Sequence, residues 1–537
     1  MRSTFMGLET AKRGMYTQQG ALHTTGHNIA NANTPGFTRQ RVNFEQSEPY
    51  PSPSINRPQI PGQMGTGVEA GSIQRVREKF LDVQYRGENN KLGYWETKME
   101  AMKKMEEVMN EPSDSGLSKT MDMFWQSLQD LAVNPTNSGA RSVVRQRGVA
   151  VAETFNYVAS SLGSIRTDLK NEIDVTENQI NSLTRQIDNL NKRIGDVEPH
   201  GYLPNDLYDE RDRLIDELSK IVDVQVTYKS SGGGSLDIAD GQATVKLMSE
   251  NGQASAILVG AGGANQIDVK YEGPNGTVSS IKVGTMEVSP EKFTSQGKLR
   301  GLIEMYGYQD FSPNFQGNVK GTYTNMMSEL DNLAYTFARE FNEIHAAGMG
   351  LNEIEAQQNV KNVFFVDPAQ ATNGEPLPND NDPLTDHLGL REGFAQRIGI
   401  SQVIKNDLDH IASADGSKPS EAAAGDSSTV LKLADVINTA FAYKAGSGEK
   451  ADFRNYYEGV IGDMAVTSQE AVRLTNNSDV LRQAVEERRI SVSGVSLDEE
   501  MTNMIKFQHA YNASARMITL QDEMLDKIIN GMGTVGR

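Results

Sequence analysis

The chain has 537 residues, a formal net charge of −19 and no cysteine. The acidic balance argues against nucleic acid or an anionic membrane surface as a partner, because both would repel it. Without cysteine, neither disulfides nor thiol chemistry contribute. No apolar run has the length of a transmembrane helix, and the first 20 residues carry no signal-peptide core. Composition therefore predicts a protein of the cytoplasm, or one exported without a cleaved signal.

The first 30 residues have the spacing of a helix with one narrow apolar seam. Such a seam is typical of a helix that packs against one other helix. The segment also carries four glycines, and each glycine inside a helix costs about 0.8–1 kcal/mol relative to alanine. Alone, this helix is expected to be marginal, although small residues allow a partner backbone to approach closely. The predicted assembly-seam residues are Phe5, Leu8, Met15, Leu22 and Ile29.

The end of the chain carries a matching seam. Ser496 and Glu499 form a capping-box start, and Asn530-Gly531 supplies a stop. We predict that the two terminal helices pair, either as a coiled coil or as two helices of an ordinary bundle. In a free subunit both are expected to be weakly ordered, with a stable intramolecular coiled coil as the alternative. The predicted seam residues here are Leu497, Met501, Met504, Tyr511, Ala515, Ile518, Leu525 and Ile529.

An asparagine-rich turn follows the first helix. Asn28, Asn31 and Asn33 can end a helix through side-chain hydrogen bonds to the backbone. Pro35-Gly36 fits the central positions of a type II turn, in which Gly36 has positive φ. The sequence predicts a fixed corner here, with an ordinary loop as the alternative. Residues 48–71 are rich in proline and glycine and predict an extended connector.

The rest of the chain is predicted to be mainly α with β insertions, in about three or four domains. Between Val222 and residue 300 the period changes from helix to strand, which predicts a small antiparallel β domain at 223–300. Residues 1–45 with 490–537 are predicted to form an elongated coiled-coil domain, and 46–222 with 301–489 a mostly helical domain. Phe80 and Val83 are expected to face a core, and Ile398–Val403 to be a strand. Helical spacing covers 75–110, 117–133, 141–197, 205–221, 323–345, 430–442 and 453–489.

Candidate catalytic and metal sites are weak. His23 and His27 lie four residues apart on a helix and could supply two metal ligands, but no third ligand is evident. The glycine-rich run at 260–263 is not followed by a helix, as a nucleotide-binding loop would be. The acidic loop at 376–386 lacks the glycine and glutamate of a calcium-binding EF-hand. We therefore predict no cofactor and no metal, and a structural protein rather than an enzyme.

Several stretches resemble the bacterial flagellar axial proteins. The run from Gly26 to Gln40 resembles the N-terminal signature shared by rod, hook and junction proteins of that superfamily. Further stretches resemble the hook-associated protein 1 family in particular. They are 116–118, 128–135, 205–212, 340–345 and 493–500 with 507–511. The likeness spans nearly the whole chain and is weakest over 223–300.

This resemblance implies a structural protein that joins the flagellar hook to the filament. It implies an inner domain of paired terminal helices, a helical domain outside it, and an outermost antiparallel β domain. It also implies assembly into a ring with copies of itself, and contacts with the hook protein and with hook-associated protein 3. Subunits of the family leave the cell through the flagellar export channel without a cleaved signal. A dedicated chaperone binds their C-terminal helix. The alternative is a hook or rod protein of the same superfamily.

Overall fold

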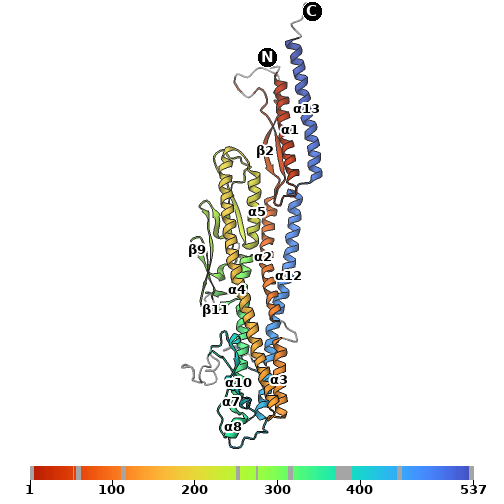
Figure 1. The fold of residues 1–537 in the computed structure, drawn as a ribbon. Helices are drawn as coiled ribbons and strands as arrows, with labels where there is room; N and C mark the ends of the chain where they lie inside the picture. Colours follow the sequence, from red (N-terminus) through yellow and green to blue (C-terminus); the bar gives the residue numbers. More distant parts are fainter. Residues whose placement is uncertain are drawn as a thin grey trace, which may run out of the picture.

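The longest element of the computed structural model is α4, a helix of 60 residues from Ser138 to Val197. At 1.5 Å per residue it is about 90 Å long. The Asn137 side chain caps it by accepting hydrogen bonds from the amides of Gly139 and Ala140, at 2.8 and 3.2 Å. Its buried stripe shifts register at Ile173. The molecule built along α4 is elongated and mostly helical, with small, mainly antiparallel sheets (Figure 1).

The structure describes residues 5–51, 54–55, 62–109, 116–248, 254–273, 276–311, 318–369, 390–443 and 450–530. The predicted acidic loop at 376–386 lies outside these ranges. The long helices are α1 (Met6–Ala30), α2 (Lys79–Met109), α3 (Leu117–Val133), α4, α5 (Asn205–Ile221), α7 (Thr322–Ala347), α12 (Phe453–Ser493) and α13 (Leu497–Ile529). The shorter ones are α6 (Lys298–Tyr306), α8 (Leu351–Ala356), α9 (Phe394–Arg397), α10 (Gln402–Asn406) and α11 (Ser428–Asp435).

Two small sheets lie against the C-terminal half of α4 (Figure 1). One has the order β3-β4-β5-β6, and the other the order β11-β10-β8-β7, with β9 beside β8. The second sheet continues to Lys320, past the predicted boundary at residue 300. The strands are β3 (Val224–Lys229), β4 (Gln242–Met248), β5 (Ala254–Gly260), β6 (Gly263–Ala264), β7 (Ile267–Glu272), β8 (Thr277–Val283), β9 (Met286–Val288), β10 (Tyr308–Asp310) and β11 (Asn318–Lys320).

Two asparagines of α4 attach these sheets to the helix. The Asn181 amide group donates to the carbonyl of Ile267 and accepts from its N–H, both at 2.8 Å. Asn191 does the same with Ala243, at 2.7 and 2.9 Å. Each asparagine side chain makes the two backbone hydrogen bonds that a neighbouring strand would otherwise make with that residue. The buried N–H and carbonyl groups of Ile267 and Ala243 therefore stay hydrogen-bonded.

A hairpin lies where an extended connector was predicted. β1 (Gln40–Gln46) pairs antiparallel with β2 (Val68–Arg75), and the hairpin packs on α1. The prediction was therefore wrong for residues 68–71. The Thr17 hydroxyl on α1 donates to the carbonyl of Val68 at 3.1 Å. We call the described residues up to Arg75 (α1, β1, β2 and the segments that join them) together with α13 the terminal unit, and the rest of the described chain the body.

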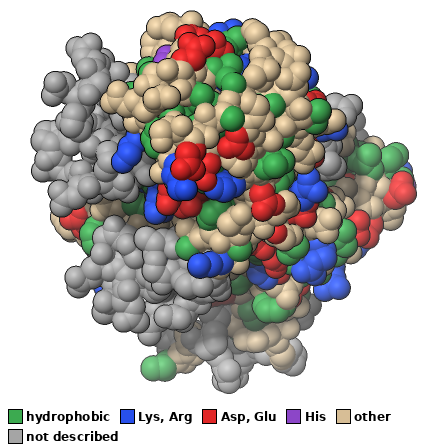
Figure 2. Space-filling view, turned by 90° about the horizontal axis from the view of Figure 1, so that it is seen from below, with side chains coloured by type: hydrophobic (Ala, Val, Ile, Leu, Met, Phe, Trp, Pro, Cys, Tyr) green, Lys and Arg blue, Asp and Glu red, His purple; other side chains and the backbone are tan. Residues whose placement is uncertain are grey.

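The predicted strand at Ile398–Val403 is also wrong. Only β14 (Gly399–Ile400) pairs, with β13 (Phe365–Val366), and α10 follows directly. Ile400 and Ile404 are both buried, and a separation of four residues is helical spacing. A further short pair joins β12 (Gly348–Met349) to β15 (Ala414–Asp415). These elements lie at the lower end of the molecule, whose surface mixes charges of both signs with scattered hydrophobic side chains (Figure 2).

The start of α2 reverses the predicted orientation. Phe80 and Val83 are 63% and 67% exposed, whereas Asp82 and Arg86 are buried. The charged residues face inward because they pair with charges on α5 and α12, as described below. Apolar periodicity therefore misplaces the first two turns of this helix.

Gly93 allows α2 and α5 to pack closely. A β-carbon at this position would lie 2.0 Å from the backbone oxygen of Lys220 on α5. A backbone atom cannot move aside as a flexible side chain does, so the site requires glycine. Gly87, on the same helix, has no atom within 4 Å of its hypothetical β-carbon.

We expect Gly93→Ala to destabilise the body by about 1–3 kcal/mol or more, as overpacking usually does. Gly87→Ala is the matched control and should raise stability by up to about 1 kcal/mol through helix propensity. Urea denaturation followed by circular dichroism measures both. Equal effects of the two substitutions would contradict the close contact.

A buried histidine ties three segments together at the lower end. His345 Nδ1 lies 2.7 Å from the carbonyl of Asn362, and its Nε2 accepts the N–H of Ala412 at 3.0 Å. This pattern requires a neutral ring. Burial lowers the pKa of His345 to about 4, and the nearby Arg141 cation lowers it further against the raising effect of the Asn362 hydrogen bond.

The free energy of unfolding is therefore expected to fall as the pH drops from about 6.5 towards 4. In this range His345 binds a proton in the unfolded chain but stays neutral in the folded chain. The share of His345 is about 2 kcal/mol at pH 5. Urea denaturation at pH 7 and pH 5 of the wild type and His345→Gln isolates it, since glutamine can keep one donor and one acceptor. An equally steep pH dependence in the variant would refute this assignment.

Candidate functional site

α1 and α13 lie side by side and antiparallel at the upper end of the molecule (Figure 1). A β-carbon on Gly7 would lie 3.0 Å from Gln521, and one on Gly14 would lie 3.2 Å from Ser514. The partners on each helix are seven residues apart. Two turns further on, the same register sets Ala21, which is buried, opposite Phe507. Small side chains at a heptad step thus bring the two backbones close together.

The predicted seam residues fall into two groups. Leu8, Met15, Leu22 and Ile29 on α1 are half-buried, and so are Met504, Tyr511, Ala515, Ile518 and Leu525 on α13. Phe5, Leu497, Met501 and Ile529 are exposed. Side chains of α13 pack directly over Gly7 and Gly14, which lie beside the predicted seam on α1. Gly20 and Gly26 have no atom within 4 Å of a hypothetical β-carbon and do not set the approach.

α13 leaves two apolar strips exposed. Leu497, Met501 and Ile505 recur every four residues near its start. Met517, Leu520, Met524 and Ile528 follow helical spacing near its end. At 100° per residue, these strips lie on opposite flanks of the face that contacts α1. Of the residues in α13, only Glu500 is fully buried.

The predicted corner is present after α1. The Phe37 N–H donates to the carbonyl of Thr34 at 3.2 Å, and Gly36 has φ = +80°. This is a type II turn with Pro35 and Gly36 in its central positions, so the predicted positive φ is confirmed. Asn31 caps the helix, because its side chain donates to the carbonyl of His27 at 3.1 Å. Asn33 is exposed.

Asn28 links three parts of the terminal unit. Its side chain donates to the carbonyl of Gln40 at 2.8 Å and accepts the Gln40 N–H at 3.0 Å. It also donates to Glu500 of α13 at 3.1 Å. Arg39 completes the cluster by pairing with Glu500 and Glu499, each at 2.7 Å. The helix end, the hairpin and α13 are therefore held in one register by buried polar contacts.

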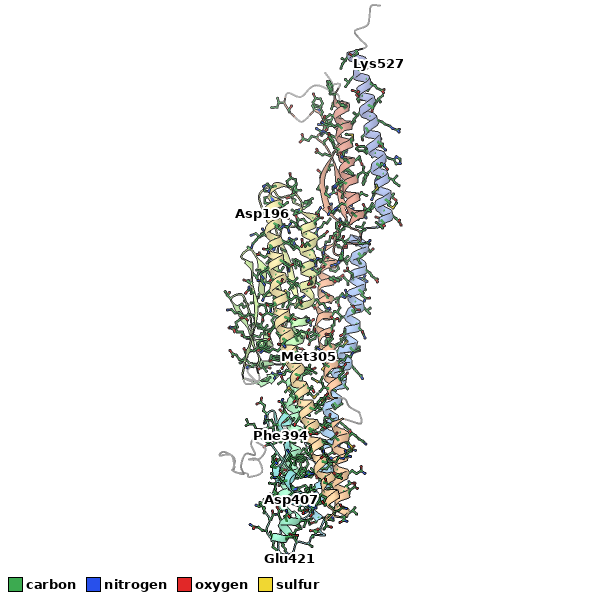
Figure 3. All side chains as sticks on the ribbon, in the orientation of Figure 1. Asp196, Met305, Phe394, Asp407, Glu421 and Lys527 are labelled. Carbon is green, nitrogen blue, oxygen red and sulfur yellow. The ribbon has the colours of Figure 1, made fainter. Side chains whose placement is uncertain are left out.

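The start of α5 binds the other side of this cluster. Asp209 accepts the Thr38 N–H at 2.9 Å, and Asp206 accepts the Gln40 amide at 2.9 Å. Asn205 donates to a carbonyl of β2 at 2.8 Å. Two stretches that were singled out separately in the sequence, 26–40 and 205–212, thus meet at one joint between the terminal unit and the body. Asp196 in Figure 3 marks the end of α4 beside this joint, and Lys527 marks the far end of α13.

Below the joint lies a buried cluster of aspartates and arginines. Asp212 lies 3.0 Å from Arg75, 3.5 Å from Arg77 and 3.6 Å from Arg86. Burial alone would raise the pKa of Asp212, but the surrounding guanidiniums hold it far below its usual range. At Asp209 burial outweighs Arg75, and the pKa is raised. The other members are Asp82, Asp216, Asp240, Arg211 and Arg489.

The joint is the functional feature that sequence reasoning missed. The two stretches are more than 160 residues apart along the chain, and no pattern in the sequence links them. A signal was present in the residues 205–213, which are rich in aspartate and arginine. Charges of both signs gathered in one short stretch indicate ion pairs with another part of the chain.

No group of three or more His, Asp or Glu side chains that could hold a metal occurs among the described residues. His23 is exposed, and His27 lies 3.5 Å from Asp206 and packs edge-on against Phe37. Within the described part of the chain, no helix has the length and apolar character needed to cross a bilayer.

Three family models match the chain. The flagellar hook-associated protein FlgK helical domain matches residues 102–364. The flagella basal body rod protein model matches 8–38, and the C-terminal model of the flagellar basal body rod FlgEFG proteins matches 487–531. The last two cover most of α1 and α13.

Curated relatives match over their full length. Flagellar hook-associated protein 1 of Bacillus subtilis is 44% identical over 541 residues, covering 100% of both chains. The protein of the same name from Escherichia coli is 25% identical and covers 97% of this chain and 99% of its own length. A solved structure, the flagellar hook junction protein FlgK from Burkholderia pseudomallei, has a TM-score of 0.57 at 14% identity. It covers 78% of this chain and 100% of its own.

The structural likeness supports the fold, and the full-length identity shows the family. The chain belongs to the flagellar hook-associated protein 1 family, the structural proteins of the junction between flagellar hook and filament.

Proposed function

We propose that this protein builds the hook–filament junction by assembling into a ring through α1 and α13. As a flagellar axial protein it assembles with other flagellar components. The observation that carries the proposal is the exposure of large apolar residues along α13. Met501 is 57% exposed and Leu520 47% exposed. A single copy leaves this surface in water, whereas a neighbouring copy would bury it.

The positions of the two strips favour a particular kind of contact. They lie on opposite flanks of α13 and have different residues, so each copy offers two different surfaces to its neighbours. Two different surfaces that meet head to tail generate a ring when the rotation closes. The half-buried seam residues hold each α13 to its own α1, and the strips would face the neighbours.

The proposed partners are further copies of this chain, the hook protein on one side and hook-associated protein 3 on the other. We also propose that the export chaperone of the family covers the C-terminal helix before assembly, and that subunits leave through the flagellar export channel. The apolar strips support this, because an exposed Met-rich surface adapts to more than one partner.

Cells that lack this protein should keep their hooks but release filament subunits into the medium, because the filament has no junction to grow on. Electron microscopy of the cells and analysis of the culture medium check this. Cells without hooks would point instead to the hook or rod alternative.

Leu520→Lys should prevent filament attachment, since it places a charge in the second strip. Val175→Lys is the matched control, because it makes the same kind of change at an exposed aliphatic residue of α4, in the body and away from both strips. Both sites are exposed in the single copy, so each substitution should change the stability of the free protein by no more than about 0.5 kcal/mol. Filaments are counted on cells that express each variant. Normal filaments with Leu520→Lys would remove the strip from the assembly surface.

A further inference from the structure

The terminal unit joins the body through only two chain crossings. One is the segment 76–78 between β2 and α2, and the other is 494–496 between α12 and α13. Both are short and neither is helical. The angle between the terminal unit and the body therefore depends on side-chain bonds across the joint. Those bonds come chiefly from α5.

Asp209 is central among these bonds. One carboxylate oxygen accepts the Thr38 N–H at 2.9 Å, and the other accepts Arg75 Nη1 at 2.7 Å. Arg77 lies 3.8 Å away. The carboxylate thus contacts the turn after α1, the end of β2 and the segment that enters α2. Its neighbour Asp212 contacts arginines but no backbone group of the terminal unit in the described bonds.

The two aspartates differ in how firmly they keep their charge. Guanidiniums surround Asp212 closely enough to overcome its burial, whereas Asp209 has one close cation. Asp209 also lines a cavity of about 420 Å³ with His27, Pro35, Gly36 and Arg213. Water can reach the carboxylate from this cavity, and the cavity leaves room for the turn to move.

We propose that Asp209 is an acid-sensitive latch, whose protonation releases the turn after α1 and so widens the range of angles between the terminal unit and the body while both parts stay folded. Protonation removes the charge that Arg75 and the Thr38 N–H bind. Arg75 keeps Asp212 and Asp240 as partners across the joint, and Asn205 and Asp206 keep theirs, so the joint loosens without coming apart. The Asn28, Arg39 and Glu500 contacts lie within the terminal unit and stay intact.

The groups that face Asp209 set the direction of the response. Arg75 on β2 and Arg77 in the segment before α2 oppose protonation. Asp206, Glu210 and Asp212 on α5 favour it, and Arg213 on α5 opposes it. His27 on α1 faces Asp206 across the cavity. Because burial raises the pKa of Asp209, the latch should open at a pH above the ordinary aspartate value of about 3.9.

Spin labels measure the angle directly, because the chain has no cysteine and two engineered ones label uniquely. Tyr16→Cys on α1 and Arg193→Cys on α4 place labels on exposed sites of two helices, one in each part. The distance distribution of the full chain should be narrow at pH 7 and should shift or broaden reversibly on acidification. Helix content by circular dichroism should stay constant over the same range.

Asp209→Asn mimics the protonated carboxyl in shape. It should give the acid-state distribution already at pH 7 and no further response to pH. Glu210→Gln, the next residue and also in the cavity lining, should keep the narrow distribution at pH 7 and the response to acid, with a midpoint at or slightly below that of the wild type. A wild-type acid response that persists in Asp209→Asn would overturn the proposal. So would a distance change that follows a loss of helix content, because the terminal unit would then be unfolding rather than turning. If Asp209→Asn fails to fold, the wild-type titration with circular dichroism still decides.

Discussion

The arrangement of the whole molecule depends on buried charges at the joint between the terminal unit and the body. Removing carboxylates and guanidiniums from water costs several kcal/mol per ion, and the pairing offsets this cost only with good geometry. Asp212 meets that condition, with arginines from β2, α2 and the segment between them around it. Such a cluster contributes little net stability. Any alternative packing that separated its members would leave buried charges without partners and would therefore be strongly unfavourable. Its role is to specify one position of α2, α5 and β2 relative to each other.

The same principle explains why sequence patterns predicted some parts well. α3 has the predicted bounds, because its apolar stripe faces an apolar core. α5 also has them, because its second half buries Leu214, Ile215 and Leu218 although Asp209 and Asp212 are buried beside them. The start of α2 failed for the opposite reason. Its interior is ionic, so Asp82 and Arg86 are inside while Phe80 and Val83 are outside. A rule that assigns apolar residues to the core inverts such a segment.

The contact between α1 and α13 was harder to predict for another reason. The residues that set it are Gly7 and Gly14, which contribute no apolar signal. Periodicity identified the half-buried residues beside them and their heptad step, but not the centre of the contact. The α2–α12 pair shows a similar pattern, since Met464, Ala471 and Ser478 lie buried at steps of seven on a helix with little amphipathic character. The hairpin of β1 and β2 was missed because β2 is mostly exposed without a buried–exposed alternation and the stretch before it is rich in proline and glycine.

The break between α12 and α13 has a mechanical consequence. The two helices together run for most of the molecule's length, and only Gly494, Val495 and Ser496 separate them (Figure 1). A β-carbon on Gly494 would lie 2.4 Å from the carbonyl oxygen of Ile490, so the break is built around a glycine. An α-helix is stiff against bending, so two helices joined end to end bend most easily at the segment between them. A force applied to the terminal unit is therefore expected to bend the chain at 494–496. The long helices of the body would remain straight.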